Sequence, residues 1–134
     1  MLSKNEDFKP PEEHEEWING EFTNVLDYLS ENKIRFDGTV YIHWVAAPFI
    51  SIWVARSTAK QGDSVWIMHN MEFTDYIISD SLKETRDVIL AFAEKWDSDS
   101  TSSLRCRTGN SDKLPKHIQM LNNVGNDDSL WINQ

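Results

Sequence analysis

Two histidines stand in short segments rich in β-branched and aromatic residues, and they are the residues best placed to do chemistry. If His43 and His69 lie on neighbouring strands, their imidazoles could approach each other, or approach Asp75 with Tyr76 beside it. A histidine oriented by a carboxylate is the smallest general-base unit. We favour the alternative that both histidines are edge or core residues bonded to the backbone, because no nucleophile or anion-binding loop accompanies them.

The other residue types that bind metals or cofactors form no recognisable pattern. The remaining histidines, His14 and His117, are expected on exposed helix faces, and the sequence contains no His-x-x-x-His, His-Glu-x-x-His or Cys–His pairing. The five glycines form neither a dinucleotide fingerprint nor a phosphate-binding loop. We therefore expect no metal and no cofactor, and we regard enzymatic activity as the less favoured possibility.

Cys106 is the single cysteine and stands between Arg105 and Arg107. Two neighbouring guanidinium groups would favour a reactive thiolate. We favour an ordinary free cysteine in a loop, because a nucleophilic cysteine needs an identifiable base. A single thiol suits a reducing cytoplasm, and the chain shows neither a signal peptide nor an apolar stretch long enough to span a bilayer. The sequence therefore predicts a cytoplasmic protein.

The net charge of −9 is concentrated near the N-terminus. Residues 1–38 contain ten acidic and four basic side chains, residues 39–98 contain eight and five, and residues 99–134 contain four of each. An acidic surface repels phosphate backbones and anionic lipids. Four basic residues between 105 and 116 are too few to reverse this, so we expect neither nucleic acid nor a membrane as a partner.

Four segments carry apolar residues at helical spacing. The segment 11–32 follows a proline, and its first turns are rich in glutamate, which the helix dipole favours there. The segment 49–60 fits either a strand or a helix, and we interpret it as a buried helix because alanines bracket it and Gly62 can end it. The segment 82–96 carries the clearest apolar stripe, and a last helix is expected to end at Gly125.

Three short segments are predicted as strands: 40–44, which is rich in β-branched and aromatic residues, and 64–69 and 73–78, which are expected to form a hairpin. We predict an α/β or α+β fold in the order α-β-α-β-β-α-α, with a small sheet of about three strands packed against about four helices. The stripe that includes Phe92 and Trp96 should pack on this sheet. The prediction is a single domain over 1–134, with a polar arm at 1–10 and a flexible loop at 97–111.

Three motifs resemble a family of small bacterial proteins of unknown function. They are Val45-Ala46-Ala47-Pro48-Phe49 with Ile52-Trp53, Thr74-Asp75-Tyr76-Ile77, and Asp127-Asp128-Ser129-Leu130-Trp131. The family tends to carry a Gly-Asp-rich turn before the second motif, where this chain has His69-Asn70-Met71-Glu72-Phe73. The resemblance implies a bacterial, cytoplasmic setting and carries no mechanism.

A small acidic domain without a catalytic motif suits protein binding. We predict an inhibitor or immunity protein that neutralises a basic partner protein, such as a toxin or effector, because complementary charge speeds encounter and selects the partner. The alternative is a small enzyme or ligand-binding domain that uses His43, His69, Asp75 and Tyr76, and an accessory subunit is a third possibility.

The predicted binding surface is the outer side of the first helix together with aromatic anchors. Its candidate residues are Glu12, Glu13, Glu16, Trp17, Asp27 and Trp131. For Trp131, docking in its own core is the favoured alternative to docking on a partner.

Overall fold

The computed structural model describes residues 11–46, 49–58, 62–98, 102–107, 109 and 112–131, and for residues 11–14 it describes the backbone alone. The predicted polar arm at 1–10 lies outside the described residues. The helices and strands are α2 (Pro11–Glu31), β1 (Phe36–Ala46), β2 (Ile50–Ser57), β3 (Ser64–Asn70), β4 (Phe73–Ser79), α3 (Thr85–Asp97), β5 (Arg105–Cys106), α4 (Leu114–Asn126) and a 3-10 turn, η1 (Asp128–Leu130).

The five strands form one antiparallel sheet in the order β1-β2-β3-β4-β5. The first four strands follow one another along the chain and pair as a meander. The very short β5 returns from the far end of α3 to pair with the start of β4, with Phe73 opposite Cys106 and Thr74 opposite Arg105. This return brings the two arginines around Cys106 to the edge of the sheet.

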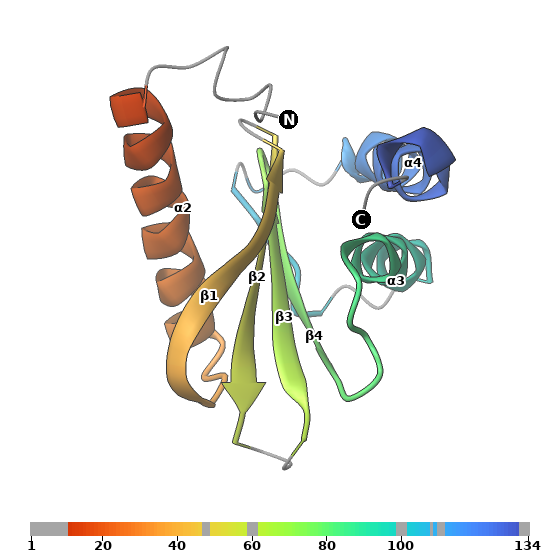
Figure 1. Ribbon diagram of the computed structural model, residues 1–134. Helices are drawn as coiled ribbons and strands as arrows, with labels where there is room; N and C mark the ends of the chain where they lie inside the picture. Colours follow the sequence, from red (N-terminus) through yellow and green to blue (C-terminus); the bar gives the residue numbers. More distant parts are fainter. Residues whose placement is uncertain are drawn as a thin grey trace.

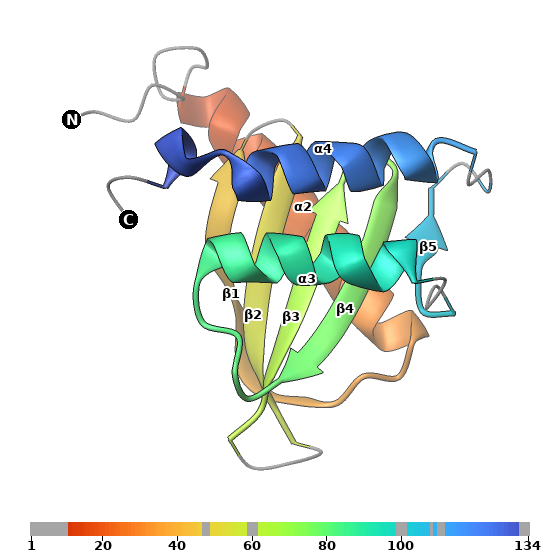
Figure 2. The ribbon, with the colours of Figure 1, turned by 90° about the vertical axis from the view of Figure 1, so that its right-hand side faces the viewer.

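Helices cover both faces of the sheet (Figures 1 and 2). The helix α2 lies alone on one face, whereas α3 and α4 lie side by side on the other. The face under α3 and α4 holds the larger apolar cluster, in which Phe92 and Trp96 are fully buried, as the sequence predicts. The face under α2 holds a second cluster around Val25, Leu29 and Trp53.

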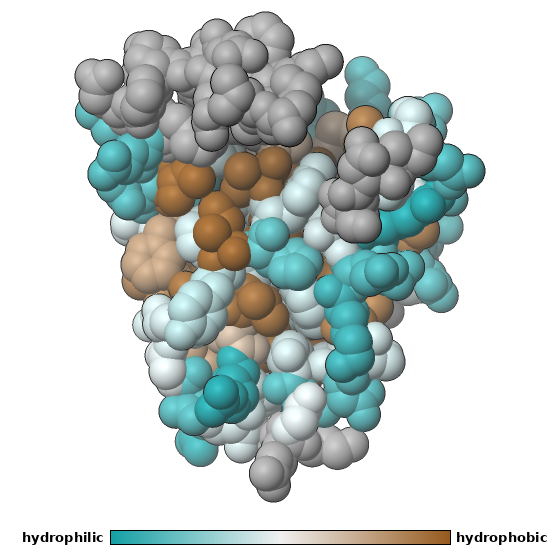
Figure 3. Space-filling view, viewed as in Figure 1, coloured by the Kyte–Doolittle hydropathy of each residue, from teal (hydrophilic) through white to brown (hydrophobic). Residues whose placement is uncertain are grey.

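Apolar side chains remain partly exposed where α2 meets the edge strand β1 (Figure 3). Three α2 residues that pack against the second cluster, Ile18, Phe22 and Leu26, are half-buried. The apolar side of α2 is therefore only partly buried, because one helix covers less of a five-stranded sheet than two helices do.

The fold is α+β, and the predicted count and order of elements were wrong. The sheet has five strands where about three were expected, and the described residues contain three α-helices where about four were expected. The observed order is α-β-β-β-β-α-β-α. Two segments account for the difference: 49–60, and the loop predicted at 97–111, within which β5 lies.

The segment interpreted as a buried helix contains the strand β2. It pairs with β1 on one side and β3 on the other, and its residues are buried on both faces of the sheet. A strand covered on both faces needs no polar alternation. Ile52 therefore packs under α3 and α4 while Trp53 packs under α2. Apolar residues at adjacent positions also fit the spacing of a buried helix, which is why the segment was predicted wrongly.

We predicted that the last helix ends at Gly125, but α4 continues to Asn126. Gly125 is buried, and a Cβ atom there would lie 2.4 Å from Cδ2 of Leu90 in α3. Its carbonyl oxygen accepts a hydrogen bond from Nε of Arg86 at 2.6 Å. The glycine therefore permits α3 and α4 to approach closely and is not the end of a helix.

Candidate functional site

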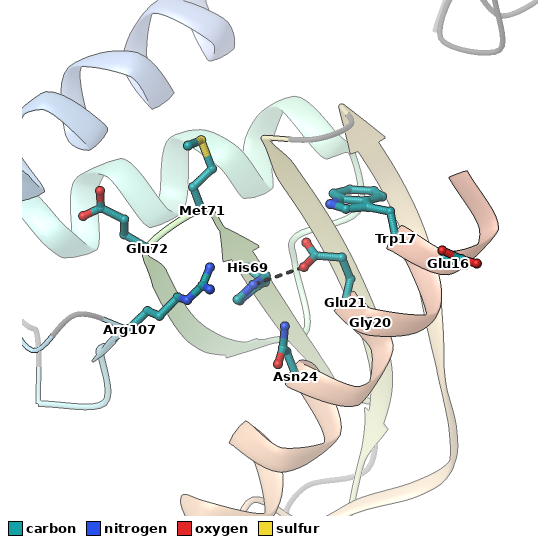
Figure 4. Close-up of a pocket in the computed structure, with 9 residues that line it drawn as sticks. All are labelled: Glu16, Trp17, Gly20, Glu21, Asn24, His69, Met71, Glu72 and Arg107. Carbon is teal, nitrogen blue, oxygen red and sulfur yellow. Dashed lines mark ion pairs between the residues drawn. The ribbon is translucent and has the colours of Figure 1, made fainter. Parts of the chain in front are cut away.

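A cleft of about 640 Å³ opens between α2 and the end of β3, and we call it the α2 cleft. From α2 it is lined by Glu16, Trp17, Gly20, Glu21 and Asn24, and from the other side by His69, Met71, Glu72 and Arg107 (Figure 4). Its volume lies in the range of small-ligand sites, roughly 300–1,000 Å³.

Local sequence explains why these side chains meet. Glu21 is four residues before Val25, so it shares the face of α2 that packs on the sheet. On the other side, the side-chain oxygen of Asn70 accepts hydrogen bonds from the backbone N–H groups of Glu72 at 3.2 Å and Phe73 at 2.9 Å. This asparagine turn fixes the β3–β4 connection, which carries Met71 and Glu72.

A buried polar network forms the floor of the α2 cleft. Glu21 and His69 point toward each other, with Oε2 and Nε2 3.2 Å apart, and each side chain is 10% exposed (Figure 4). The hydroxyl of Ser51 donates to the other carboxylate oxygen of Glu21 at 2.9 Å. Nδ1 of His69 lies 2.6 Å from Oγ1 of Thr74.

Both ring nitrogens of His69 have partners. Nε2 faces the Glu21 carboxylate and Nδ1 faces the Thr74 hydroxyl, so neither nitrogen is left for a further hydrogen bond. Because neither ring nitrogen is open, His69 is poorly placed to take a proton from a substrate. The network instead fixes α2 against β2, β3 and β4 and presents a carboxylate at the bottom of the cleft.

A side pocket of about 410 Å³ adjoins the α2 cleft and shares Asn24, His69 and Arg107 with it. Its wall adds Thr74, Arg105 and Cys106. Arg105 is already engaged, since its guanidinium donates to Glu31 at 2.8 Å and to the Asn24 carbonyl at 3.3 Å. Cys106 is half-buried and lies in the strand β5, whereas we predicted a loop at this position.

The four residues of the predicted catalytic set do not converge. His43 lies on the α3 side of the sheet, where its ring meets Trp66 edge-on at 4.9 Å, whereas His69 lies on the α2 side. Desolvation beside Trp66 lowers the pKa of His43. Asp75 and Tyr76 are adjacent in β4 and point to opposite faces. The structure therefore supplies no general-base site built from these residues.

Asp75 is instead the centre of a buried structural network. The side chain is fully buried and accepts hydrogen bonds from Nε1 of Trp96 at 2.8 Å, from Nζ of Lys95 at 3.0 Å and from the backbone N–H of Tyr76 at 2.8 Å. The Ser103 hydroxyl donates to the same carboxylate at 2.5 Å. The Tyr28 hydroxyl lies 3.3 Å from it and donates to the Ser103 carbonyl at 2.6 Å. Burial, and then the charge of Asp75, raise the pKa of Tyr28.

The predicted partner-binding residues divide into exposed, half-buried and buried positions. Glu16 and Asp27 are exposed on α2, and Trp17 is half-buried at the α2 cleft. The side chains of Glu12 and Glu13 lie outside the described residues.

Trp131, the remaining candidate anchor, is docked in the protein's own core. The side chain is 8% exposed, its ring lies 5.5 Å from that of Trp44, and Nε1 donates to the Val124 carbonyl at 3.0 Å. Self-docking, the favoured alternative, is therefore correct, and the ring is not available to a partner.

Sequence reasoning missed Glu21, Ser51 and Thr74. A signal existed for Glu21, the one acidic residue on the apolar face of α2, since a carboxylate at a core-facing position needs a partner. Within the described residues no three His, Cys, Asp or Glu side chains group as a metal site would require. In the same part of the chain, no helix is long and apolar enough to cross a membrane.

Comparison with known proteins agrees with the motif-based resemblance to proteins of unknown function. A family model described as Domain of unknown function (DUF4826) matches residues 12–131, which includes all three motifs. No curated protein and no solved structure matches the chain. The chain therefore belongs to the DUF4826 family, a domain of unknown function.

Proposed function

We propose that the protein is a protein-binding domain whose docking surface is the acidic outer side of α2, and that it neutralises a basic partner such as a toxin or effector in the cytoplasm. The observation that carries this proposal is the composition of α2, which has seven acidic residues and no lysine or arginine in 21 residues. The helix lies alone on its face of the sheet, so no second helix of the described residues shields its outer side (Figure 1).

The exposed charges of α2 suit a role in encounter. Glu15, Glu16 and Asp27 are exposed and lie on a regular helix, which fixes their spacing. Rim charges of this kind mainly set the rate of association and its dependence on salt, while affinity depends on a few buried anchors. Trp17 is the aromatic side chain best placed to anchor the partner, because it lines the α2 cleft beside these acids.

The alternative of an enzyme that uses His43, His69, Asp75 and Tyr76 has less support. These side chains lie on different faces of the sheet, and both ring nitrogens of His69 have partners. Protein binding requires no such convergence.

The test is to identify a partner by affinity capture and then to measure its association rate at low and high salt. We expect Glu16→Lys with Asp27→Lys to slow association at low salt by about tenfold, because steering charges change on-rates by that order. The matched control is Glu94→Lys with Asp97→Lys on α3, which changes the net charge equally on the opposite layer. An association rate that changes neither with salt nor with the charge reversal on α2 would reject the acidic side of α2 as the docking surface.

A further inference from the structure

We propose that the α2 cleft receives an arginine side chain of the basic partner, with Glu21 and Glu16 as its charge partners and Trp17 as its stacking wall. This inference rests on the proposed function, and it goes further by naming the group that the cleft recognises. It starts from the unused acceptor capacity of a buried carboxylate.

Glu21 has room for further donors. Among the described residues its carboxylate contacts only Ser51 and His69, one on each oxygen. A carboxylate offers about four lone-pair sites, so each oxygen of Glu21 can accept one more hydrogen bond. Glu21 is nine-tenths buried, and its two described contacts are with a hydroxyl and an imidazole. A cation entering the cleft would bring donors to the open acceptor sites and positive charge to this carboxylate.

The α2 wall suits a guanidinium in particular. Trp17 and Glu21 are four residues apart on α2 and therefore share one side of the helix. A planar guanidinium can bond a carboxylate through two N–H groups and also lie against an aromatic ring, which a lysine ammonium does less well. Glu16 adds negative charge at the exposed rim of the cleft, and Met71, which is 53% exposed, adds apolar surface for the arginine stem.

The protein's own Arg107 already places a guanidinium in this cleft. Its side chain reaches toward His69 from the β5 side (Figure 4). We read Arg107 as an internal competitor that the partner's arginine displaces. If the cleft bound an anion instead, removing Arg107 would weaken binding, because Arg107 would then be the group that holds the ligand.

The experiment is a titration of the full-length chain with the peptide acetyl-Arg-Arg-Arg-amide, followed by NMR at the Trp17 indole N–H, which Trp17→Phe assigns. We expect saturable binding that Glu16→Gln and Trp17→Ala each weaken about fivefold, with Glu94→Gln on α3 unchanged as the matched control. Arg107→Ala should tighten binding several-fold. The corresponding lysine peptide should bind more weakly.

Several results would overturn the inference. They are a loss of binding in Arg107→Ala, equal binding of the arginine and lysine peptides, or wild-type affinity in both Glu16→Gln and Trp17→Ala. Glu21→Gln tests the carboxylate at the floor of the cleft directly and should also weaken peptide binding. Because this variant can disturb the buried network as well, Glu16→Gln, which lies at the exposed rim, is the decisive variant. Salt-sensitive association of a protein partner without peptide binding would reject the cleft and retain the proposed function. Specific peptide binding with no protein partner would retain the cleft as an arginine site and reject the proposed function.

Discussion

Two buried carboxylates differ in how their charge is compensated. Asp75 accepts hydrogen bonds from Ser103, Tyr76, Trp96 and the ammonium of Lys95, and the Tyr28 hydroxyl lies 3.3 Å away, so its network joins α2, β4 and α3. Glu21 has two contacts, one with a hydroxyl and one with an imidazole. A buried charge that faces an ammonium and several further donors stabilises a fold, whereas one with few donors at the floor of a cleft can serve a ligand.

Replacing Asp75 with asparagine should be strongly destabilising. The substitution keeps the side-chain volume but removes the charge opposite Lys95 and turns an acceptor into a donor facing other donors. We expect a loss of about 3–5 kcal/mol in the free energy of unfolding, the cost of removing one partner of a buried pair. Asp97→Asn, at an exposed site on α3, is the control and should cost less than about 0.5 kcal/mol. Urea denaturation measures both, and a loss below about 1 kcal/mol for Asp75→Asn would contradict the structural role.

His117 should make stability depend on pH. Its ring packs edge-on against Phe73 at 4.9 Å and its Nδ1 is buried, so desolvation lowers its pKa below the ordinary value of 6.5, while Glu72 opposes this effect and Lys113 adds to it. The unfolded chain therefore takes up a proton first as the pH falls. The contribution of the neutral, buried His117 ring to the free energy of unfolding is present above pH 6.5. It is lost as the pH drops from there toward the pKa of His117 in the folded state.

The variant His117→Gln should flatten this dependence. The free energy of unfolding, measured by urea denaturation between about pH 7.5 and pH 5, should fall less steeply than in the wild type. His43→Gln should act in the same direction, because the pKa of His43 is also lowered. A slope that neither substitution changes would show that other groups control the acid response.

The polar networks lay beyond sequence reasoning for a physical reason. Ser51 is 30 residues from Glu21 and 18 residues from His69 in the chain. The contact of these three residues depends on the register of β2 with β3, which places Ser51 opposite His69. No local spacing encodes that register. The exposure of Glu16 and Asp27, by contrast, follows from helical periodicity alone and was predictable.

At the scale of elements, periodicity predicted the amphipathic helices well and failed for the inner strand β2. The helices α2 and α3 each bury one side, so their apolar residues recur at the helical spacing. The strand β2 is buried on both sides, and its sequence lacks the alternation that identifies a strand. The two-residue β5 has no pattern to detect, since it pairs only with the start of β4.

The contact between α3 and α4 provides a test of element packing. Gly125→Ala would place a methyl group 2.4 Å from Cδ2 and 2.6 Å from Cγ of Leu90, so one helix or the leucine must move. We expect a loss of about 1–3 kcal/mol in the free energy of unfolding, as for other overpacked sites. Gly20→Ala on α2 is the matched control, because nothing lies within 4 Å of its added Cβ and alanine favours a helix by up to about 1 kcal/mol.

The outcome for the pair has a definite sign. Gly125→Ala should lower stability and Gly20→Ala should raise it, and combining Gly125→Ala with Leu90→Ala should cost less than the sum of the two single losses. Equal effects of the two alanine substitutions in urea denaturation would show that close helix approach does not explain Gly125.

At the scale of the whole molecule, charge is distributed unevenly between the two layers. The single helix on one face, α2, carries seven acids without a lysine or arginine, whereas α3 carries both signs. Within α2, acidic residues recur three or four positions apart, and each such like-charge pair destabilises a helix by about 0.2–0.5 kcal/mol. The surface that we propose for binding is therefore held at some cost to the stability of the free protein.

Salt should consequently stabilise the protein. Raising sodium chloride from about 10 mM to 500 mM shortens the Debye length from about 30 Å to less than 10 Å and screens the repulsion along α2. We expect the free energy of unfolding in urea, an uncharged denaturant, to rise by about 1 kcal/mol. The triple variant Glu15→Gln, Glu16→Gln, Asp27→Asn should be more stable at low salt and lose most of this dependence. Asp87→Asn, Glu94→Gln, Asp97→Asn on α3 removes the same net charge and should retain the dependence, because its charges lie away from α2. If both triple variants lose the dependence equally, the net charge of −9 and not its placement on α2 governs the response.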